Sequence, residues 1–462
     1  MAGKALGVVS ELRRRTEAQA NSGSTINPGD LMSSTTITEP TSDAIVDGRY
    51  VILSVDGHAG AEMHTYREYL SSKYHAEFDE WATTFVNPFD DLRAEGAYRN
   101  WDSARRLEET SKDGLAAELL YPNTIPPFYP SGNLTARPPK AGEHELRWEG
   151  LKAHNRWLAD FCNDAPGRRA GMAQILLHDV DAAVEEIRWA KEANLFGGIL
   201  LPGIPPDSGL TPFIDPAYEP IWRTCSELDM PINHHTANAS PEYGQFPATG
   251  WMFFVEAGFY SHRVLWMLIF AGVFERYPSL KLILTEGGAD WVPGVMKILD
   301  HQYNKMDPNH RTGFGAVSQT EKGKNVVRDA FGGMLMNPRS PSEYYQQNVW
   351  IGSSFTTQRE AAMRYEVGVD KMMWGNDYPH REATYPYTRE ALRHSFSDVD
   401  PTEVAMMLGS NAAKVYDFDM DLMRKVAVEI EAPTVAEVQV PLDVIPDDAH
   451  SMAFEGGPTR IW

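Results

Sequence analysis

Carboxylate and imidazole side chains stand at the ends of four apolar runs of strand length in this sequence. Asp56 and His58 lie two residues apart at the end of the first run, so in a strand both would point to the same side. His235, Glu286 and Asp377 end three later runs. Imidazole nitrogen and carboxylate oxygen are ligands that proteins offer to divalent metal ions. If these four ends meet, the sequence predicts one shared metal site.

Three further residues near these runs each have two interpretations. Glu62 follows the first run and is either a further ligand or a solvated loop carboxylate. His262 begins an apolar helical stretch, where it either reaches the pocket or only caps the helix. His178 follows the third run, and a surface or loop-packing role fits it at least as well as a functional one. We therefore treat Glu62 as a candidate ligand and His262 as a candidate catalytic residue.

Strand alternation separates two neighbouring histidines. His234 and His235 point to opposite sides of a strand, so at most one of them faces the site. We assign His235, which falls at the tip of the strand, and expect His234 to pack against a neighbouring strand or loop. Glu286 could instead satisfy the amides of the glycine turn that follows it. Asp377 is interpreted as a ligand or proton acceptor rather than a turn residue, and either Asp377 or His380 would shuttle a proton.

Eight apolar runs alternate with helical patterns along the chain. This pattern predicts parallel βα units that close into an α/β barrel, and a single barrel with insertions fits the length. In such a barrel the carboxyl ends of all strands meet at one face, which is where the candidate residues stand. The predicted strands cover residues 51–56, 116–121, 172–177, 198–201, 231–235, 281–286, 349–352 and 372–377.

The barrel is predicted to have polar arms at both ends. We expect an N-terminal arm at residues 1–44, the barrel at 45–418 and an extended C-terminal arm at 419–462. Two long connections, 63–115 and 287–347, are expected to form the walls and lid of the pocket because loops that follow strands face the active site. The arms make an oligomer plausible, either with a second copy or with a homologous subunit.

Composition excludes several classes of partner. The chain has 462 residues and a net charge of -22, and such a surface repels nucleic acid and anionic membranes. Only two cysteines occur, so a disulfide framework or a cysteine zinc site is not expected, and a cytoplasmic location is the simplest. No apolar run reaches the length of a membrane span. A small molecule is therefore the expected substrate.

The chain resembles the amidohydrolase superfamily, and specifically its "amidohydrolase 2" branch, which includes decarboxylases of aromatic and muconate-semialdehyde acids. The likeness runs from about residue 50 to 418. It implies a distorted TIM (β/α)8 barrel, with Asp56, His58, His235 and Asp377 as metal ligands. The motifs that carry it are Asp56–His58, Asp113–Gly114, Glu118–Pro122, Pro231–His235, Glu286–Pro293, Gly375–His380 and Asn411–Tyr416.

The sequence departs from this resemblance at Glu286, where hydrolytic members usually have histidine. The resulting oxygen-rich ligand set favours iron or manganese over zinc and has enough carboxylates for two ions. A small branch of similar proteins hydroxylates substrates with a dinuclear iron or iron–manganese centre. We therefore expect a dinuclear monooxygenase that hydroxylates a small organic substrate with O2. The alternatives are a mononuclear zinc or manganese hydrolase or non-oxidative decarboxylase, and a scaffold subunit with a structural metal site.

Overall fold

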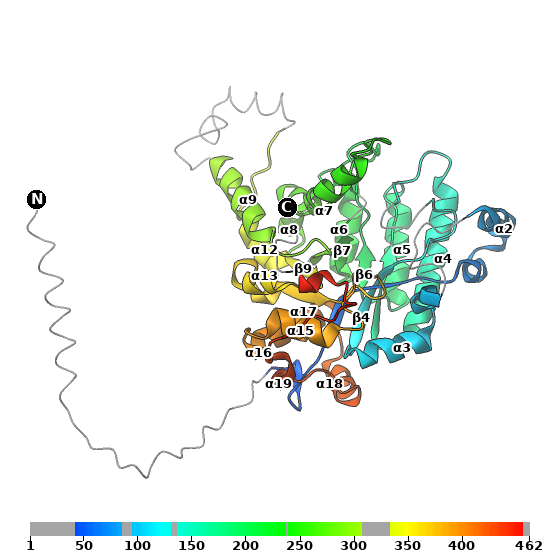
Figure 1. The fold of residues 1–462 in the computed structure, drawn as a ribbon. Helices are drawn as coiled ribbons and strands as arrows, with labels where there is room; N and C mark the ends of the chain where they lie inside the picture. Colours follow the sequence, from blue (N-terminus) through cyan, green and yellow to red (C-terminus); the bar gives the residue numbers. More distant parts are fainter. Residues whose placement is uncertain (1–41, 86–94, 131–135, 237–238, 307–332, 456–462) are drawn as a thin grey trace, which may run out of the picture. The chain divides into compact units, whose positions relative to one another are not determined.

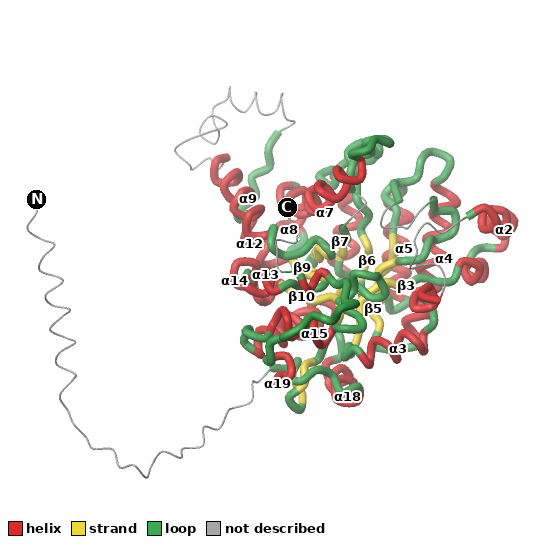
Figure 2. Tube along the Cα trace, in the orientation of Figure 1, coloured by secondary structure: helices red, strands yellow, loops and turns green. Residues whose placement is uncertain are grey.

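The computed structural model describes residues 42–85, 95–130, 136–236, 239–306 and 333–455. Within these ranges eight strands form one parallel sheet, in which each strand pairs with the next along the chain. The strands lie at the centre with helices around them (Figures 1 and 2). The predicted distorted TIM barrel is confirmed, with strand ends shifted by a few residues. The strands are β3 (Leu53–Ala59), β4 (Ala117–Pro122), β5 (Arg169–Gln174), β6 (Gly198–Leu200), β7 (Ile232–His235), β8 (Leu282–Thr285), β9 (Val349–Ser354) and β10 (Met372–Gly375).

The barrel closes through contacts between its first and last strands. The amide of His58 donates to the carbonyl of Tyr378 (2.7 Å), and the amide of Asp377 donates to the carbonyl of Asp56 (2.7 Å). A Cβ atom on Gly375 would lie only 2.6 Å from the Cβ of Asp56, so glycine permits this close approach. The closure sets the residues that follow β10 directly beside the end of β3.

The helices pack on the barrel through apolar faces, as α5 illustrates. Its buried residues Ala183, Ile187 and Ala190 follow the spacing of one helical face, and the Asp179 side chain caps its first turn by accepting from the amide of Ala182. The described helices are α2 (His75–Thr84), α3 (Ser103–Lys112), α4 (His144–Asn163), α5 (Val180–Glu192), α6 (Glu219–Glu227), α7 (Thr249–Phe270), α8 (Val273–Arg276), α9 (Val292–Met306), α12 (Pro341–Asn348), α13 (Gln358–Ala362), α14 (Arg364–Val367), α15 (Thr388–Phe396), α16 (Pro401–Ala405), α17 (Asn411–Tyr416), α18 (Met420–Glu429) and α19 (Val435–Val438). None of these described helices combines the length and apolar character needed to cross a bilayer.

Two of the predicted segments differ from the structure. The C-terminal segment does not extend as an arm over residues 419–455, because α18 and α19 pack against the barrel, and Glu437 pairs with Arg389 of α15 at 3.0 Å. The helix expected to begin at His262 instead begins thirteen residues earlier, at Thr249, and ends before the left-handed Gly272. The N-terminal arm lies outside the described residues except for 42–44, as does much of the expected lid, at 307–332.

Replacing Asp113 with asparagine should stabilise the protein at neutral pH. Asp113 is 5% exposed and accepts hydrogen bonds from the amide and hydroxyl of Thr388. Burial raises the pKa of Asp113 from 3.8 to about 6, against the lowering effect of those hydrogen bonds. Folding therefore holds a proton that the unfolded chain releases, so the contribution of Asp113 to stability is greatest below about pH 4 and is lost as pH rises through about 6. The loss amounts to roughly 3 kcal/mol.

The measurement is the free energy of unfolding in denaturant for both proteins at pH 4 and pH 8. Asparagine can accept from the Thr388 amide and donate to its hydroxyl, which has a second partner in Thr384 (2.6 Å). The difference in free energy of unfolding, variant minus wild type, should be about 2–3 kcal/mol larger at pH 8 than at pH 4. An equal difference at the two pH values would contradict the assignment of a raised pKa.

Candidate metal centre

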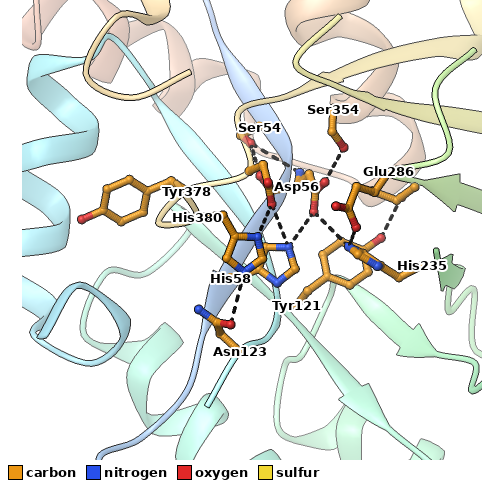
Figure 3. Close-up of polar contacts among 12 residues, drawn as sticks. Ser54, Asp56, His58, Tyr121, Asn123, His235, Glu286, Ser354, Tyr378 and His380 are labelled. Carbon is orange, nitrogen blue, oxygen red and sulfur yellow. Dashed lines mark hydrogen bonds and ion pairs between the residues drawn. The ribbon is translucent and has the colours of Figure 1, made fainter. Parts of the chain in front are cut away.

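Asp56 and His58 are fully buried on β3, as strand alternation predicts, and both face the end of β10. The Nε2 atom of His58 lies 3.2 Å from Oδ1 of Asp56 and 3.1 Å from Oδ1 of Asp377. Because Asp377 follows β10 by two residues, the closure of the barrel described above creates this contact. Figure 3 shows Asp56 and His58 side by side on the strand.

His235 and Glu286 complete the group from the neighbouring strands β7 and β8. The Nε2 atom of His235 lies 2.9 Å from Oε2 of Glu286 and 3.7 Å from Oδ1 of Asp56. His234 turns the other way, and its Nδ1 contacts the carbonyl of Leu201 at 3.0 Å. The structure thus brings together the five residues predicted at four strand ends, which are Asp56, His58, His235, Glu286 and Asp377. Figure 3 labels the first four of them.

Two of the carboxylates stand on residues with left-handed backbone. Glu286 has φ 59° and Asp377 has φ 61°. A residue with a side chain seldom adopts this conformation, which costs roughly 1–3 kcal/mol. At both positions the strand has just ended, and the left-handed residue brings its carboxylate to the histidine at the barrel mouth. Local strain at these two positions is therefore tied to the geometry of the site.

The hydrogen-bond partners of the two imidazoles fit a metal ion. The Nδ1 atom of His58 contacts the carbonyl of Pro122 (3.4 Å), and that of His235 contacts the carbonyl of Thr236 (2.7 Å). A carbonyl only accepts, so Nδ1 carries the proton and the other ring nitrogen faces the carboxylates, as in histidines that bind metals. Among the described residues, no hydrogen-bond partner is found for the buried atoms Asp56 Oδ1, His58 Nε2, His235 Nε2 and Asp377 Oδ2.

The charges of these groups agree with a cation between them. Burial would raise the pKa of Asp56, but the neighbouring imidazoles of His235 and His58 lower it below the usual value. Burial would lower the pKa of His235, yet the charge of Glu286 and the contact with Asp56 raise it well above 6.5. The ionised form of Asp56 and the protonated form of His235 are therefore favoured. A divalent ion would meet the same demand, so the residues present fit one.

His380 lies against the same group and contacts Asp377. Its Nδ1 is 2.8 Å from Oδ1 of Asp377, its Nε2 is 3.2 Å from Oδ1 of Asn123, and its ring centroid is 4.1 Å from that of His58. Burial would lower the pKa of His380, but the charge of Asp377 and the hydrogen bond with it outweigh burial and raise the pKa to about 10. His380 thus holds a proton beside Asp377.

Two of the candidate residues lie outside this group. The carboxylate of Glu62 caps a short 3-10 helix (Met63–Tyr69) by accepting from the amide of His64 at 2.9 Å. His262 lies in the interior of α7, where its ring stacks on Trp291 with centroids 3.7 Å apart, so it does not cap the helix. It stands behind Gly287, because a Cβ atom there would lie 2.5 Å from Nε2 of His262.

The structure also adds residues that the sequence reasoning missed. Ser354 donates to Asp56, Asn123 contacts His380, and the hydroxyl of Tyr121 donates to Thr285 at 2.8 Å beside the site. All three stand at or just past strand ends, so extending the search from charged to polar side chains would have found them. Glu382 has no such signal, yet its carboxylate gathers with those of Glu286 and Asp377, with oxygen atoms within 4.8 Å of one another.

Comparison with known protein families identifies the family of this chain. A family model described as amidohydrolase matches residues 128–418. The chain belongs to the amidohydrolase family. The match agrees with the resemblance that the sequence motifs carry.

Several relatives of this amidohydrolase are decarboxylases. It is 27% identical over 292 residues to a gamma-resorcylate decarboxylase of Rhodococcus jostii, covering 60% of this chain and 79% of the relative. It is 23% identical over 332 residues to the 2-amino-3-carboxymuconate-6-semialdehyde decarboxylase of Dictyostelium discoideum, covering 69% of this chain and 77% of the relative.

Solved structures show the same fold. A 5-carboxyvanillate decarboxylase from Novosphingobium aromaticivorans, solved with manganese, matches with a TM-score of 0.57 and 17% identity over 82% of this chain and all of its own. A 2,6-dihydroxybenzoate decarboxylase from Rhizobium matches with a TM-score of 0.54 and 20% identity over 79% of this chain and 98% of its own.

The expectation of a dinuclear iron or iron–manganese monooxygenase is wrong. The relatives of this amidohydrolase are gamma-resorcylate and muconate-semialdehyde decarboxylases, not oxygenases. That expectation rested on ligand type, and a set rich in carboxylates suits manganese as well as iron. Ligand type therefore constrains the metal and leaves the reaction open, whereas the relatives favour the alternative of non-oxidative decarboxylation.

Proposed function

We propose that this protein is a metal-dependent, non-oxidative decarboxylase of a small hydroxylated aromatic acid or a related unsaturated acid. The observation that carries the proposal is the buried group of Asp56, His58, His235 and Asp377, whose inward atoms lack hydrogen-bond partners among the described residues. It stands in a chain whose relatives are decarboxylases. Manganese is the proposed metal, since two decarboxylases of this fold were solved with it and, with Glu286, three of the five candidate ligands are carboxylates.

The residues around the metal site can supply the proton that the reaction needs. A bound divalent ion would supply Lewis-acid charge for the oxygen atoms of the substrate. Asp377 Oδ1 and His380 Nδ1 hold a proton between them at 2.8 Å. That proton would move to the ring carbon that bears the carboxylate. The bond from this carbon to the carboxylate then breaks, carbon dioxide leaves, and the electron pair of the bond stays with the ring.

The test is release of carbon dioxide by the manganese-loaded protein from 2,6-dihydroxybenzoate, 5-carboxyvanillate and related hydroxybenzoates, with and without oxygen. We expect release from at least one acid at a rate that oxygen does not change. Asp377→Asn should lower the rate by about 10²–10⁴-fold, because it removes the ionised partner of the proton. Glu62→Gln is the matched control, since it lies outside the group and keeps an acceptor for His64. No release from any of these acids, or release that needs oxygen, would contradict the proposal.

A further inference from the structure

A second group of buried polar side chains lines a cavity between the segments that follow β4, β5 and β6. The cavity contains none of the five residues of the metal centre. Its walls include Tyr129, Arg147, Gln174, His178, Leu200 and Leu210. Tyr129 and Arg147 come from the connection after β4 and the first turn of α4, and Gln174 ends β5. Loops after strands and carboxyl ends of strands form the active-site face of such a barrel.

Gln174 points into the barrel and lacks partners for both of its polar atoms. A Cβ atom on Gly171 would meet Cys162 of α4 and Leu195, so position 171 faces outward, and Gln174, three residues later, faces inward. Gln174 is 1% exposed, and neither its Oε1 nor its Nε2 has a hydrogen-bond partner among the described residues. Buried amide groups are normally paired, so these atoms call for a ligand or ordered water.

Arg147 brings positive charge that is poorly neutralised. Its side chain is buried, and its Nε atom lacks a partner among the described residues, while Nη2 donates to the carbonyl of Arg137 at 2.8 Å. The carboxylate of Glu143 is 3.9 Å from Nη1 and half exposed to water. The guanidinium lies 4.2 Å from the ring centroid of Tyr129, whose buried hydroxyl also lacks a partner in the described part of the chain.

Two further basic side chains, His178 and Arg137, line the rim of the cavity. Burial and the charges of His144 and Arg147 lower the pKa of His178. Arg137 lies on the same wall, with its charge already paired to Asp207 at 2.7 Å. A lowered pKa favours the neutral form of His178, so Arg147 supplies the unneutralised positive charge of the cavity, in a chain whose net charge is -22. The unpaired donors and the charge together match an anion with at least two acceptor oxygens.

We propose that Arg147, Tyr129 and Gln174 form a carboxylate-binding subsite. The cavity has a volume of about 30 Å³. One water molecule needs about 10–15 Å³ of such space, so the cavity has room for about three heavy atoms, as in a carboxylate group. The carboxylate is either a free small acid or a second acidic group carried by the substrate. The second source rests on the proposed function, whereas the first does not.

The test is to titrate the metal-free, full-length protein with acetate, benzoate and isophthalate and to measure binding by calorimetry. We expect at least one of these probes to bind, and Arg147→Met to weaken that binding at least tenfold, because it removes the charge and the free Nε donor. Gln174→Leu should weaken it several-fold. Binding of acetate would identify a free acid as the ligand, and binding of the aromatic acids alone would identify a group carried by the substrate.

Two controls keep the result specific to this subsite. Arg137→Met removes a guanidinium from the same wall that is already paired with Asp207, so binding should stay within about twofold. His58→Ala disables the metal centre and should leave carboxylate binding unchanged. Because the titration uses no metal, failure of decarboxylation would not affect it. Wild-type affinity in a folded Arg147→Met protein, loss of binding in His58→Ala, or no binding of any probe would overturn the proposal.

Discussion

The variant His235→Asn should lose its divalent metal, and its neighbour variant His234→Asn should keep it. Asparagine can retain the contact of each Nδ1 with its carbonyl, at Thr236 O or Leu201 O, and removes only the Nε2 side of the ring. For His235 that side lies 2.9 Å from Glu286 and 3.7 Å from Asp56. The change therefore deletes a proposed ligand without altering the carboxylates.

The expected loss is large because a ligand contributes more than the residues that orient it. Loss of an orienting residue alone costs about 10–100-fold in metal affinity. We expect His235→Asn to retain less than a tenth of the manganese bound by the wild type after desalting, measured by elemental analysis. Decarboxylation should fall with the metal content.

His234→Asn serves as the matched control, because both histidines are buried on the same strand and differ in the side they face. Burial lowers the pKa of His234 to about 4, so the wild-type ring is neutral at pH 7. Its variant should bind manganese as the wild type does. A full complement of metal in His235→Asn, with both variants folded, would show that His235 is not a ligand.

Arg106→Met should destabilise the protein by about 3–5 kcal/mol, the usual cost of breaking a buried ion pair. Arg106 is fully buried and makes two hydrogen bonds to Glu118, at 2.7 and 2.8 Å. Its Nη1 also donates to the carbonyl of His58 at 2.7 Å. Removal leaves Glu118 buried, since Arg169 Nε is 3.9 Å away and too distant for a hydrogen bond.

The measurement is the free energy of unfolding in denaturant at pH 7. The control is Arg67→Met, because Arg67 makes the same two-bond contact with Asp79 on the surface, where both side chains are about half exposed. The loss of stability in Arg67→Met should be small beside that in Arg106→Met, because water screens the exposed pair. The double variant Arg106→Met/Glu118→Met should recover part of the stability, since no charge is then left buried. Equal losses in the two single variants would contradict this account.

Arg106 also connects stability to the metal centre. Its guanidinium holds the carbonyl of His58 and lies 4.8 Å from the ring centroid of Tyr378, the residue after Asp377. It therefore supports both strands whose closure brings His58 to Asp377. The sequence alone marked Glu118 only as part of a motif, and nothing local in it pairs Glu118 with Arg106 of the preceding helix.

The sequence by itself determined the eight strands and the side that each candidate residue faces. Both follow from local physics, because apolar runs of strand length form buried strands and alternate residues point to opposite sides. This was enough to distinguish His235 from His234 and to place Asp56 and His58 on one side. It also located most of the site, because parallel strands in a barrel end at the same face.

The tertiary structure decided which of those residues meet. His262 stacks on Trp291, which lies far from it in sequence, whereas Glu62 caps the turn that directly follows it. Packing between segments also decided three other features. These are the left-handed backbone at Glu286 and Asp377, the gathering of Glu382 with them, and the cavity around Arg147. Local patterns carry no distances between such segments, so the metal-competent residue types could be predicted, while their pairing and the reaction could not.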